Sequence, residues 1–143
     1  MINYKNSLKE LTRLTMKKIL IMDGAMGTEI QKLNMNEDDF RGKRFSKSNI
    51  DLKGNNDLLS ITQPDLIKEI HKAYCISGAD IIETNTFSST SIAQSDYGLE
   101  KTAYELNKAS AQIAKQVTIE FYKENNRRVY VAGAIGPTNR TAS

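Results

Sequence analysis

The chain has 143 residues, which is enough for one ordinary domain with a hydrophobic core. Hydrophobic residues make up 39% and charged residues 26% of the sequence, proportions that exclude a disordered chain. The formal net charge is +3 and the basic residues are spread along the sequence, which excludes the clustered basic surface typical of nucleic-acid-binding proteins.

The number of cysteines and the length of the apolar runs exclude two further classes, disulfide-stabilised proteins and membrane-spanning proteins. Cys75 is the only cysteine, so an internal disulfide is excluded and a reducing, cytoplasmic location is expected. No apolar run approaches the ~18 residues that would cross a bilayer, so no membrane contact is expected. The basic residues Lys43, Arg44 and Lys47, and the pair Arg127 and Arg128, are expected on the solvated surface.

Residues 1–18 carry three spaced leucines among charged residues, without a continuous apolar core. This pattern excludes a secretory signal and predicts a short surface helix that forms an N-terminal extension of the domain. A basic amphipathic presequence is the alternative.

Residues 19–22 form a short apolar run that predicts a buried strand, and the acid Asp23 and a glycine-punctuated turn follow it. In parallel α/β folds, ligands bind beyond the carboxyl ends of the strands. Asp23 would therefore project into a site, and the backbone of residues 24–27 could approach a ligand closely. The alternative is an acidic turn residue that hydrogen-bonds its own backbone.

Residues 29–62 are polar and show little periodicity. A connection of this length inside a domain is usually functional or disordered. Within it, residues 54–59 have the composition of a structured turn.

A helix is predicted next, with Thr62 as its cap, Pro64 in its first turn and Gly78 at its end. Its buried face is expected to consist of five residues at helical spacing: Leu66, Ile67, Ile70, Ala73 and Tyr74. His71 and Cys75 lie four residues apart on the same helix. Two ligands are too few for a zinc site, so packing or surface roles are expected for both.

The remaining elements follow in the order strand, helices, strand. Residues 79–85 predict a second strand, residues 89–97 and then 99–126 predict helices, and residues 129–135 predict a third strand with an exit turn at 136–138. Alternating strands and helices indicate a parallel sheet with right-handed crossovers. Each strand ends in polar or glycine-rich residues, so the three ends would meet at one rim and form a single small-molecule site. A phosphate or nucleotide site is disfavoured, because no P-loop lysine and no G-x-G-x-x-G pattern follows a strand.

Five blocks in this order and spacing resemble the homocysteine-binding domain of cobalamin-dependent methionine synthase. They are MDGAMGT (22–28), DDFRG (38–42), DLKGNNDLL (51–59), GADIIETNTF (78–87) and GPTNRT (136–141). The resemblance runs from residue 19 to residue 143. Homocysteine methyltransferases that use betaine or S-methylmethionine share the Asp-Gly opening and the Gly-Ala-Asp strand but lack the Lys-Gly-Asn-Asn-Asp and Glu-Thr-Asn-Thr-Phe blocks as a set, which favours the cobalamin branch.

The resemblance implies an α/β fold in which residues 19–143 supply the first three strands and associated helices of a (β/α)8 TIM-type barrel, which is incomplete here. In this family, zinc at the rim binds the homocysteine sulfur, and the thiolate attacks the methyl group of methylcobalamin to give methionine. The metal makes a thiolate available at neutral pH, where a free thiol of pKa ~8.5 is mostly protonated.

By motif match, Asp23 would hold the substrate ammonium, and the backbone amides of Gly24, Ala25 and Met26 would receive its carboxylate. Asn85 and Thr86 would line the same rim. No catalytic or metal-binding residue is assigned in this chain, because the family's zinc ligands are three cysteines in later strands and Cys75 does not match any of them.

The expected partners are homocysteine, the remaining barrel, and cobalamin and folate domains. Zinc and cobalamin belong to the complete enzyme; this chain alone is expected to bind neither and to be inactive. The alternative is a stand-alone small-molecule-binding or complementation fragment without catalysis.

Overall fold

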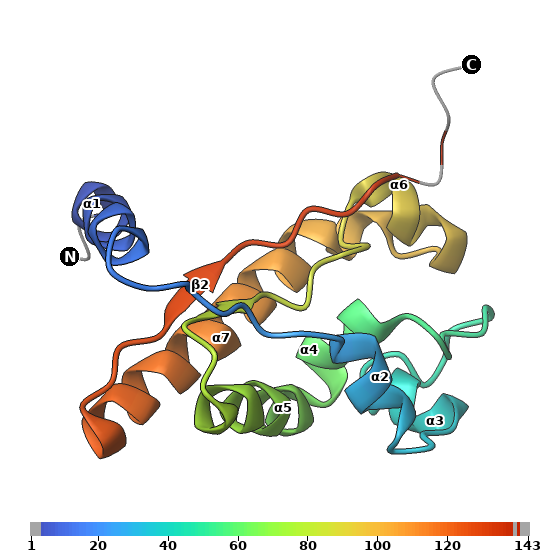
Figure 1. Ribbon diagram of the computed structural model, residues 1–143. Helices are drawn as coiled ribbons and strands as arrows, with labels where there is room; N and C mark the ends of the chain where they lie inside the picture. Colours follow the sequence, from blue (N-terminus) through green and yellow to red (C-terminus); the bar gives the residue numbers. More distant parts are fainter. Residues whose placement is uncertain (1–3, 139, 141–143) are drawn as a thin grey trace.

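The computed structural model describes residues 4–138 and residue 140. In this part of the chain, seven α-helices and two strands are linked by turns and three short 3-10 helices (Figure 1). They are α1 (Tyr4–Thr15), α2 (Met26–Gln31), α3 (Glu37–Arg41), η1 (Asn56–Leu58), α4 (Leu59–Thr62), α5 (Pro64–Ser77), β1 (Ile81–Glu83), α6 (Ser91–Gln94), η2 (Ser95–Tyr97), η3 (Glu100–Thr102), α7 (Ala103–Asn125) and β2 (Tyr130–Ala132). Residues 139 and 141, which belong to the last sequence block, lie outside the described residues.

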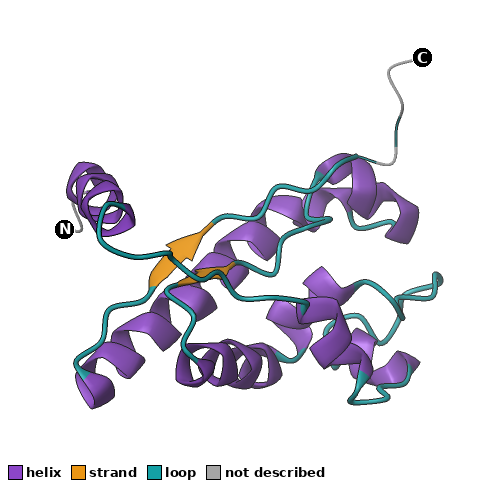
Figure 2. Cartoon of the chain, viewed as in Figure 1, coloured by secondary structure: helices purple, strands orange, loops and turns teal. Residues whose placement is uncertain are grey.

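The sheet is small, open and parallel. β1 and β2 pair in parallel (Figure 2), with Ile82 opposite Val131. A single parallel bridge joins Met22 to Ile81. The extended segments therefore lie side by side in chain order, as the sequence predicts. Both strands are shorter than expected.

The predicted buried strand at residues 19–22 is wrong. It forms one bridge only, and the side chains of Ile19 and Ile21 are 88% and 59% exposed. Helices α5 and α7 lie on the same side of the strands in Figure 1, so this small sheet is covered on one face. The three predicted barrel strands thus appear as two strands and a bridged extended segment, and the closed barrel stays a prediction.

The core beneath β1 explains why the helices dock there. Ile82 is fully buried and lies in one hydrophobic cluster with Cys75 of α5 and with Val117 and Phe121 of α7. The alternation of side chains along a strand sends Ile82 to the helices and its neighbours to the opposite face.

Helix α5 has the predicted ends. Pro64 lies in its first turn, and Gly78 ends it with a left-handed φ of 110°, a conformation that favours glycine. The capping residue is Gln63, which makes no side-chain cap bond, so the prediction for Thr62 is wrong.

The buried face of α5 also differs from the prediction. Ala73 is exposed, while His71 and Cys75 are fully buried, so of the two roles expected for them, packing or surface, the structure shows packing. Arg127 is not a solvated surface residue, because it donates to the main-chain oxygens of Cys75 and Ala79 and lies over the Phe121 ring.

The segment 29–62 is more ordered than its sequence suggested. It contains α3, η1 and α4, and Phe40, Leu52, Leu58 and Leu59 are buried in a second hydrophobic cluster. Helix α3 begins with a capping box, in which Asn36 and Asp39 each accept a backbone N–H from the other.

Helix α1 is anchored at the amino ends of the strands. Glu10 of α1 pairs with Arg128, two residues before β2. Lys18, three residues after the end of α1, pairs with Asp80, one residue before β1, at 2.6 Å. The division of the chain after residue 18 stays a prediction. In the described residues, no helix has both the length and the apolar character needed to cross a membrane.

Candidate functional site

The carboxyl ends of the extended segments surround a cavity of about 280 Å³. Its lining residues are Asp23, Gly24, Ala25, Met26, Gly27, Glu83, Thr84, Asn85, Thr86, Phe87 and Ala134. All six residues that the sequence predicts for a substrate site lie in this set. The structure therefore brings them together, although their roles toward a substrate stay predictions.

Asp23 joins the first extended segment to β1. Its backbone N–H donates to the Ile81 oxygen at 2.9 Å, and its two carboxylate oxygens accept the Glu83 N–H at 3.1 and 3.0 Å. Burial raises the pKa of Asp23 from 3.8 to about 6; the hydrogen bond from Glu83 opposes this rise and the Glu83 charge adds to it. At neutral pH, Asp23 is thus a partly desolvated carboxylate suited to a cationic group.

The turn after Asp23 supplies backbone donors. No acceptor among the described residues receives the N–H groups of Gly24, Ala25, Met26 or Gly27. A Cβ on Gly24 would lie 3.7 Å from the Tyr74 hydroxyl, and one on Gly27 would lie 3.5 Å from Asn56 Nδ2. Consecutive free N–H groups of this kind suit an anionic oxygen.

The amide nitrogen of Asn85 is hydrogen-bonded within the protein. Its Nδ2 donates to the Asn56 main-chain oxygen at 2.8 Å and to Ser60 Oγ at 3.3 Å. These bonds fix the amide, and its oxygen has no hydrogen-bond donor among the described residues. Asn85 therefore adds a second acceptor to the cavity wall.

The hydroxyl of Thr86 makes its hydrogen bonds within the protein. Its hydroxyl donates to the Ala134 oxygen at 2.8 Å and lies 2.7 Å from the Thr84 hydroxyl, which accepts the Ala134 N–H at 3.0 Å. This network ties the end of β1 to the end of β2. Thr86 thus lies in the cavity wall, while its hydroxyl bonds the protein itself and its role toward a substrate stays a prediction.

A second cavity of about 370 Å³ adjoins the first. The two share Met26, Gly27, Asn85 and Phe87 as a common wall. The second cavity is also lined by Asp57, Ser88 and Tyr97, which are not among the predicted site residues. The signal for Asp57 was its place in the Lys-Gly-Asn-Asn-Asp block.

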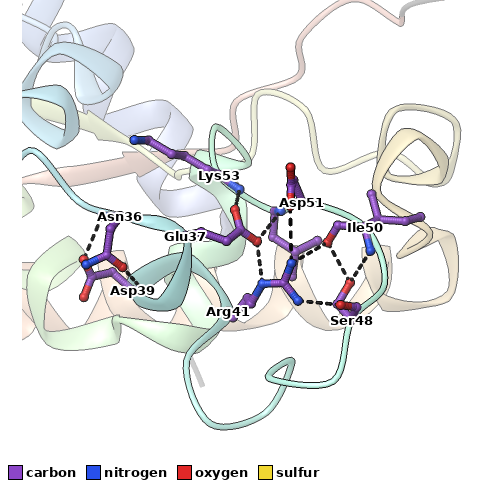
Figure 3. Close-up of polar contacts among 9 residues, drawn as sticks. Asn36, Glu37, Asp39, Arg41, Ser48, Ile50, Asp51 and Lys53 are labelled. Carbon is purple, nitrogen blue, oxygen red and sulfur yellow. Dashed lines mark hydrogen bonds and ion pairs between the residues drawn. The ribbon is translucent and has the colours of Figure 1, made fainter.

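Helix α3 holds the loop that leads into this block (Figure 3). The Glu37 carboxylate accepts the N–H groups of Leu52 and Lys53, both at 2.7 Å, and Arg41 Nε at 2.6 Å. Arg41 also donates to the main-chain oxygens of Ser48 and Ile50. The loop 42–53 is therefore closed onto α3, which fixes the start of the turn at Gly54.

Metal ligands do not gather in the described part of the chain. No group of three or more His, Cys, Asp or Glu side chains there is placed to hold a metal ion. Cys75 lies in the helix-packing core, on the covered face of the sheet. These residues do not fit a zinc site, and no step of chemistry is assigned to a metal here.

The sequence model of the homocysteine S-methyltransferase family matches residues 20–143. The chain belongs to this family. The match covers every residue of both cavities.

Two solved structures of the family resemble this chain. Both are the homocysteine methyltransferase MmuM from Escherichia coli, one in a metallated and one in an oxidized form, with 26% and 27% sequence identity. Each match has a TM-score of 0.69 and covers 89% of this chain. The chain spans only 41% and 40% of the two MmuM chains. It therefore corresponds to part of a homocysteine S-methyltransferase fold.

Proposed function

We propose that this chain forms part of the homocysteine site of a methionine synthase, which transfers a methyl group from methylcobalamin to homocysteine. The observation that carries the proposal is the cavity at the carboxyl ends of the extended segments. There, the Asp23 carboxylate, the Asn85 amide oxygen and a run of free backbone N–H groups line the same space.

These groups are complementary to the two charges of an α-amino acid. The ammonium group would lie against Asp23 and the Asn85 oxygen, since both accept hydrogen bonds. The carboxylate would lie on the N–H groups of residues 24–26, since these have no other acceptor. The thiol end of homocysteine would then extend away from Asp23.

The cobalamin branch rests on the resemblance of the Lys-Gly-Asn-Asn-Asp and Glu-Thr-Asn-Thr-Phe blocks. The two blocks are in direct contact, because Asn85 donates to the Asn56 oxygen, and Asp57 accepts from Ser88 and Ser89, which directly follow the second block. Zinc and cobalamin belong to the complete enzyme in this proposal. No residue of this chain is assigned to hold either, and the chain alone is expected to show no methyl transfer.

A binding experiment tests the homocysteine site. We expect L-homocysteine to shift the backbone NMR signals of residues 23–27 and 83–87. Asp23→Asn should weaken the binding at least about tenfold, because a hydrogen bond to a charged group is lost. Binding of 4-mercaptobutyrate, which lacks the ammonium group, should not change.

Asp38→Asn is the matched control, because Asp38 is exposed and lies outside both cavities. Equal affinity of the wild type and Asp23→Asn for L-homocysteine would contradict the role of Asp23. No binding by the wild type would contradict the proposed site.

The methyl donor needs a separate assay. The endogenous protein that contains this sequence should methylate homocysteine with methylcobalamin and not with S-methylmethionine. Its intact mass would show how much polypeptide accompanies these residues. Turnover with S-methylmethionine alone would assign the protein to the other branch of the family.

A second candidate is a binding or complementation fragment without catalysis. The exposed apolar side chains of the strand segments favour its complementation form, in which another polypeptide covers them, since Ile19, Ile21 and Ile135 are 88%, 59% and 92% exposed. A monomer in sedimentation velocity with one sharp thermal transition would support a stand-alone module. Loss of the sharp transition, with aggregation, would argue that these residues need further cover.

A further inference from the structure

Asp57 is a buried carboxylate outside the predicted set of site residues. It lies in η1, is 4% exposed, and uses one oxygen, Oδ2, to accept two hydrogen bonds. The donors are the Ser88 N–H and the Ser89 hydroxyl, both at 2.7 Å. Thirty-one residues separate Asp57 from Ser88, so this contact joins two distant segments.

The contact belongs to a larger link between these segments. Asn55 and Gln94 exchange two amide hydrogen bonds, at 2.8 and 3.1 Å, and Gln94 also donates to the Ser88 oxygen at 3.0 Å. The Ser88 main chain is thus held at its N–H by Asp57 and at its oxygen by Gln94. The turn after β1 has little freedom to move while both contacts are present.

The restrained turn carries the wall of the candidate site. Asn85 and Phe87 lie just before Ser88, and both line the two adjoining cavities. Because Asn85 lies three residues before Ser88, a displacement of Ser88 would strain the two bonds that fix the Asn85 amide and so shift its oxygen relative to Asp23.

The negative charge of Asp57 strengthens the two hydrogen bonds that its side chain accepts. Burial raises the pKa of Asp57, and the hydrogen bonds from Ser89 and Ser88 oppose that rise. A carboxylate accepts both bonds more strongly than a neutral amide would. An acid with no such donors would be costly at a buried position.

We propose that Asp57 is a positioning residue for the homocysteine site, which holds the turn 85–89 so that the Asn85 oxygen faces the substrate ammonium group. Asp57 acts through Ser88 and Ser89 and makes no contact with the substrate. This inference rests on the proposed function for the identity of the ligand. The link between the two segments is independent of it.

The test compares Asp57→Ala, Asp57→Asn and Ser89→Ala with the exposed control Asp38→Ala. In Asp57→Ala, hydrogen exchange of the Ser88 amide should be at least about tenfold faster, as expected for a lost bond to a charged group. The affinity for L-homocysteine should fall by a similar factor. The affinity for 4-mercaptobutyrate, which has no ammonium group for Asn85 to meet, should stay unchanged.

Asp57→Asn keeps an oxygen acceptor, so it should recover part of the affinity. Ser89→Ala removes one donor and leaves the carboxylate in place, so it should show a smaller effect in the same direction. If Asp57→Ala does not fold, these two variants still test whether Asp57 positions the turn 85–89.

Unchanged Ser88 exchange in the variants would overturn the proposal. So would a loss of affinity that is equal for both ligands, because a purely structural defect has no preference for the ammonium group. Absence of L-homocysteine binding by the wild type would contradict the proposed function. In that case Ser88 exchange would still decide whether Asp57 holds the turn.

Discussion

Asp23 and Glu83 are joined across neighbouring extended segments, since both carboxylate oxygens of Asp23 accept the same Glu83 N–H, at 3.1 and 3.0 Å. The one donor does not compensate fully for the loss of water around Asp23, and the pKa of Asp23 rises to about 6. The residue is therefore poised to gain from a cationic ligand.

Asp23→Asn is expected to raise the thermal midpoint of the free protein at pH 7. The folded pKa of Asp23 is above its ordinary value of 3.8, so its contribution to stability is present below that value and lost as pH rises through about 6. The neutral amide avoids this loss. Calorimetry at pH 7 and pH 4 should show a gain at pH 7 that shrinks at pH 4, and a lower midpoint at pH 7 would contradict the assignment.

The binding of L-homocysteine should weaken as pH falls from 7 to 5. Asp23 is ionised above about 6 and protonated below it, and only the ionised form attracts an ammonium group. Titration calorimetry across this range should give a midpoint near pH 6, and Asp23→Asn should lack it. A flat profile in the wild type would separate Asp23 from the ligand.

His71 should make the fold sensitive to acid. Both ring nitrogens are buried without a hydrogen-bond partner in the described structure, and burial lowers the pKa of His71 from 6.5 to about 4. The unfolded chain therefore binds the extra proton between these values, and stability falls as pH falls from 6.5 to 4. The full effect is on the order of 3 kcal/mol.

Urea unfolding of the wild type and His71→Leu measures this effect. The variant should lack the His71 part of the slope between pH 6.5 and 4. The comparison with the wild type is needed because Asp23 contributes a slope of the opposite sign. Identical pH profiles would show that His71 does not titrate as inferred.

Gly136 and Gly133 form a matched pair. A Cβ at Gly136 would lie 2.2 Å from the Phe87 oxygen and 2.9 Å from its ring, whereas one at Gly133 would meet nothing within 4 Å. Gly136→Ala should therefore cost about 1–3 kcal/mol of unfolding free energy and displace Phe87, with Gly133→Ala close to neutral. Equal unfolding midpoints for the two variants would exclude the close approach of the Gly136 main chain to Phe87.

Glu37→Gln should loosen the loop that Figure 3 shows closed onto α3. Burial raises the pKa of Glu37, but the N–H groups of Leu52 and Lys53 and the Arg41 side chain together lower it below 4.5. The stabilisation is therefore present above that pH and is lost as pH falls through the lowered pKa. We expect a loss of about 1–2 kcal/mol at pH 7, measured by urea unfolding, together with faster exchange of the Leu52 amide. Asp38→Asn is the control, and an equal effect in both variants would point to helix charge instead.

Local signals in the sequence were sufficient to place the two ends of α5, although not its cap or its whole buried face, and they failed for residues 19–22. Pro64 and Gly78 mark the ends of α5 through their own backbone preferences. Whether Ile19 and Ile21 are buried depends on what covers the sheet, which is a tertiary property. The predicted surface position of Arg127 is wrong for the same reason. Its hydrogen-bond acceptors lie about 50 residues earlier in the chain, so only the tertiary fold brings them together.

In the candidate site, too, some features follow from local sequence and others depend on tertiary contacts. Asp23 and the following turn could be predicted because ligand-binding residues follow strands in parallel α/β folds. The commitment of the Thr86 hydroxyl to Ala134, and the bonds of Asp57 to Ser88 and Ser89, could not be predicted. Both depend on how separate turns meet in space, and no periodicity records that.

The burial of Cys75 makes the chain convenient for site-specific attachment. It is the only cysteine, it is fully buried, and burial raises the pKa of its thiol, so alkylating reagents should leave the native protein unlabelled. A cysteine introduced in place of Leu8, which is 69% exposed on α1, would be the only thiol accessible to the reagent. Because α1 is anchored at the amino ends of the strands, a fluorophore or a sensor surface attached there would leave the cavity at the opposite end facing solution.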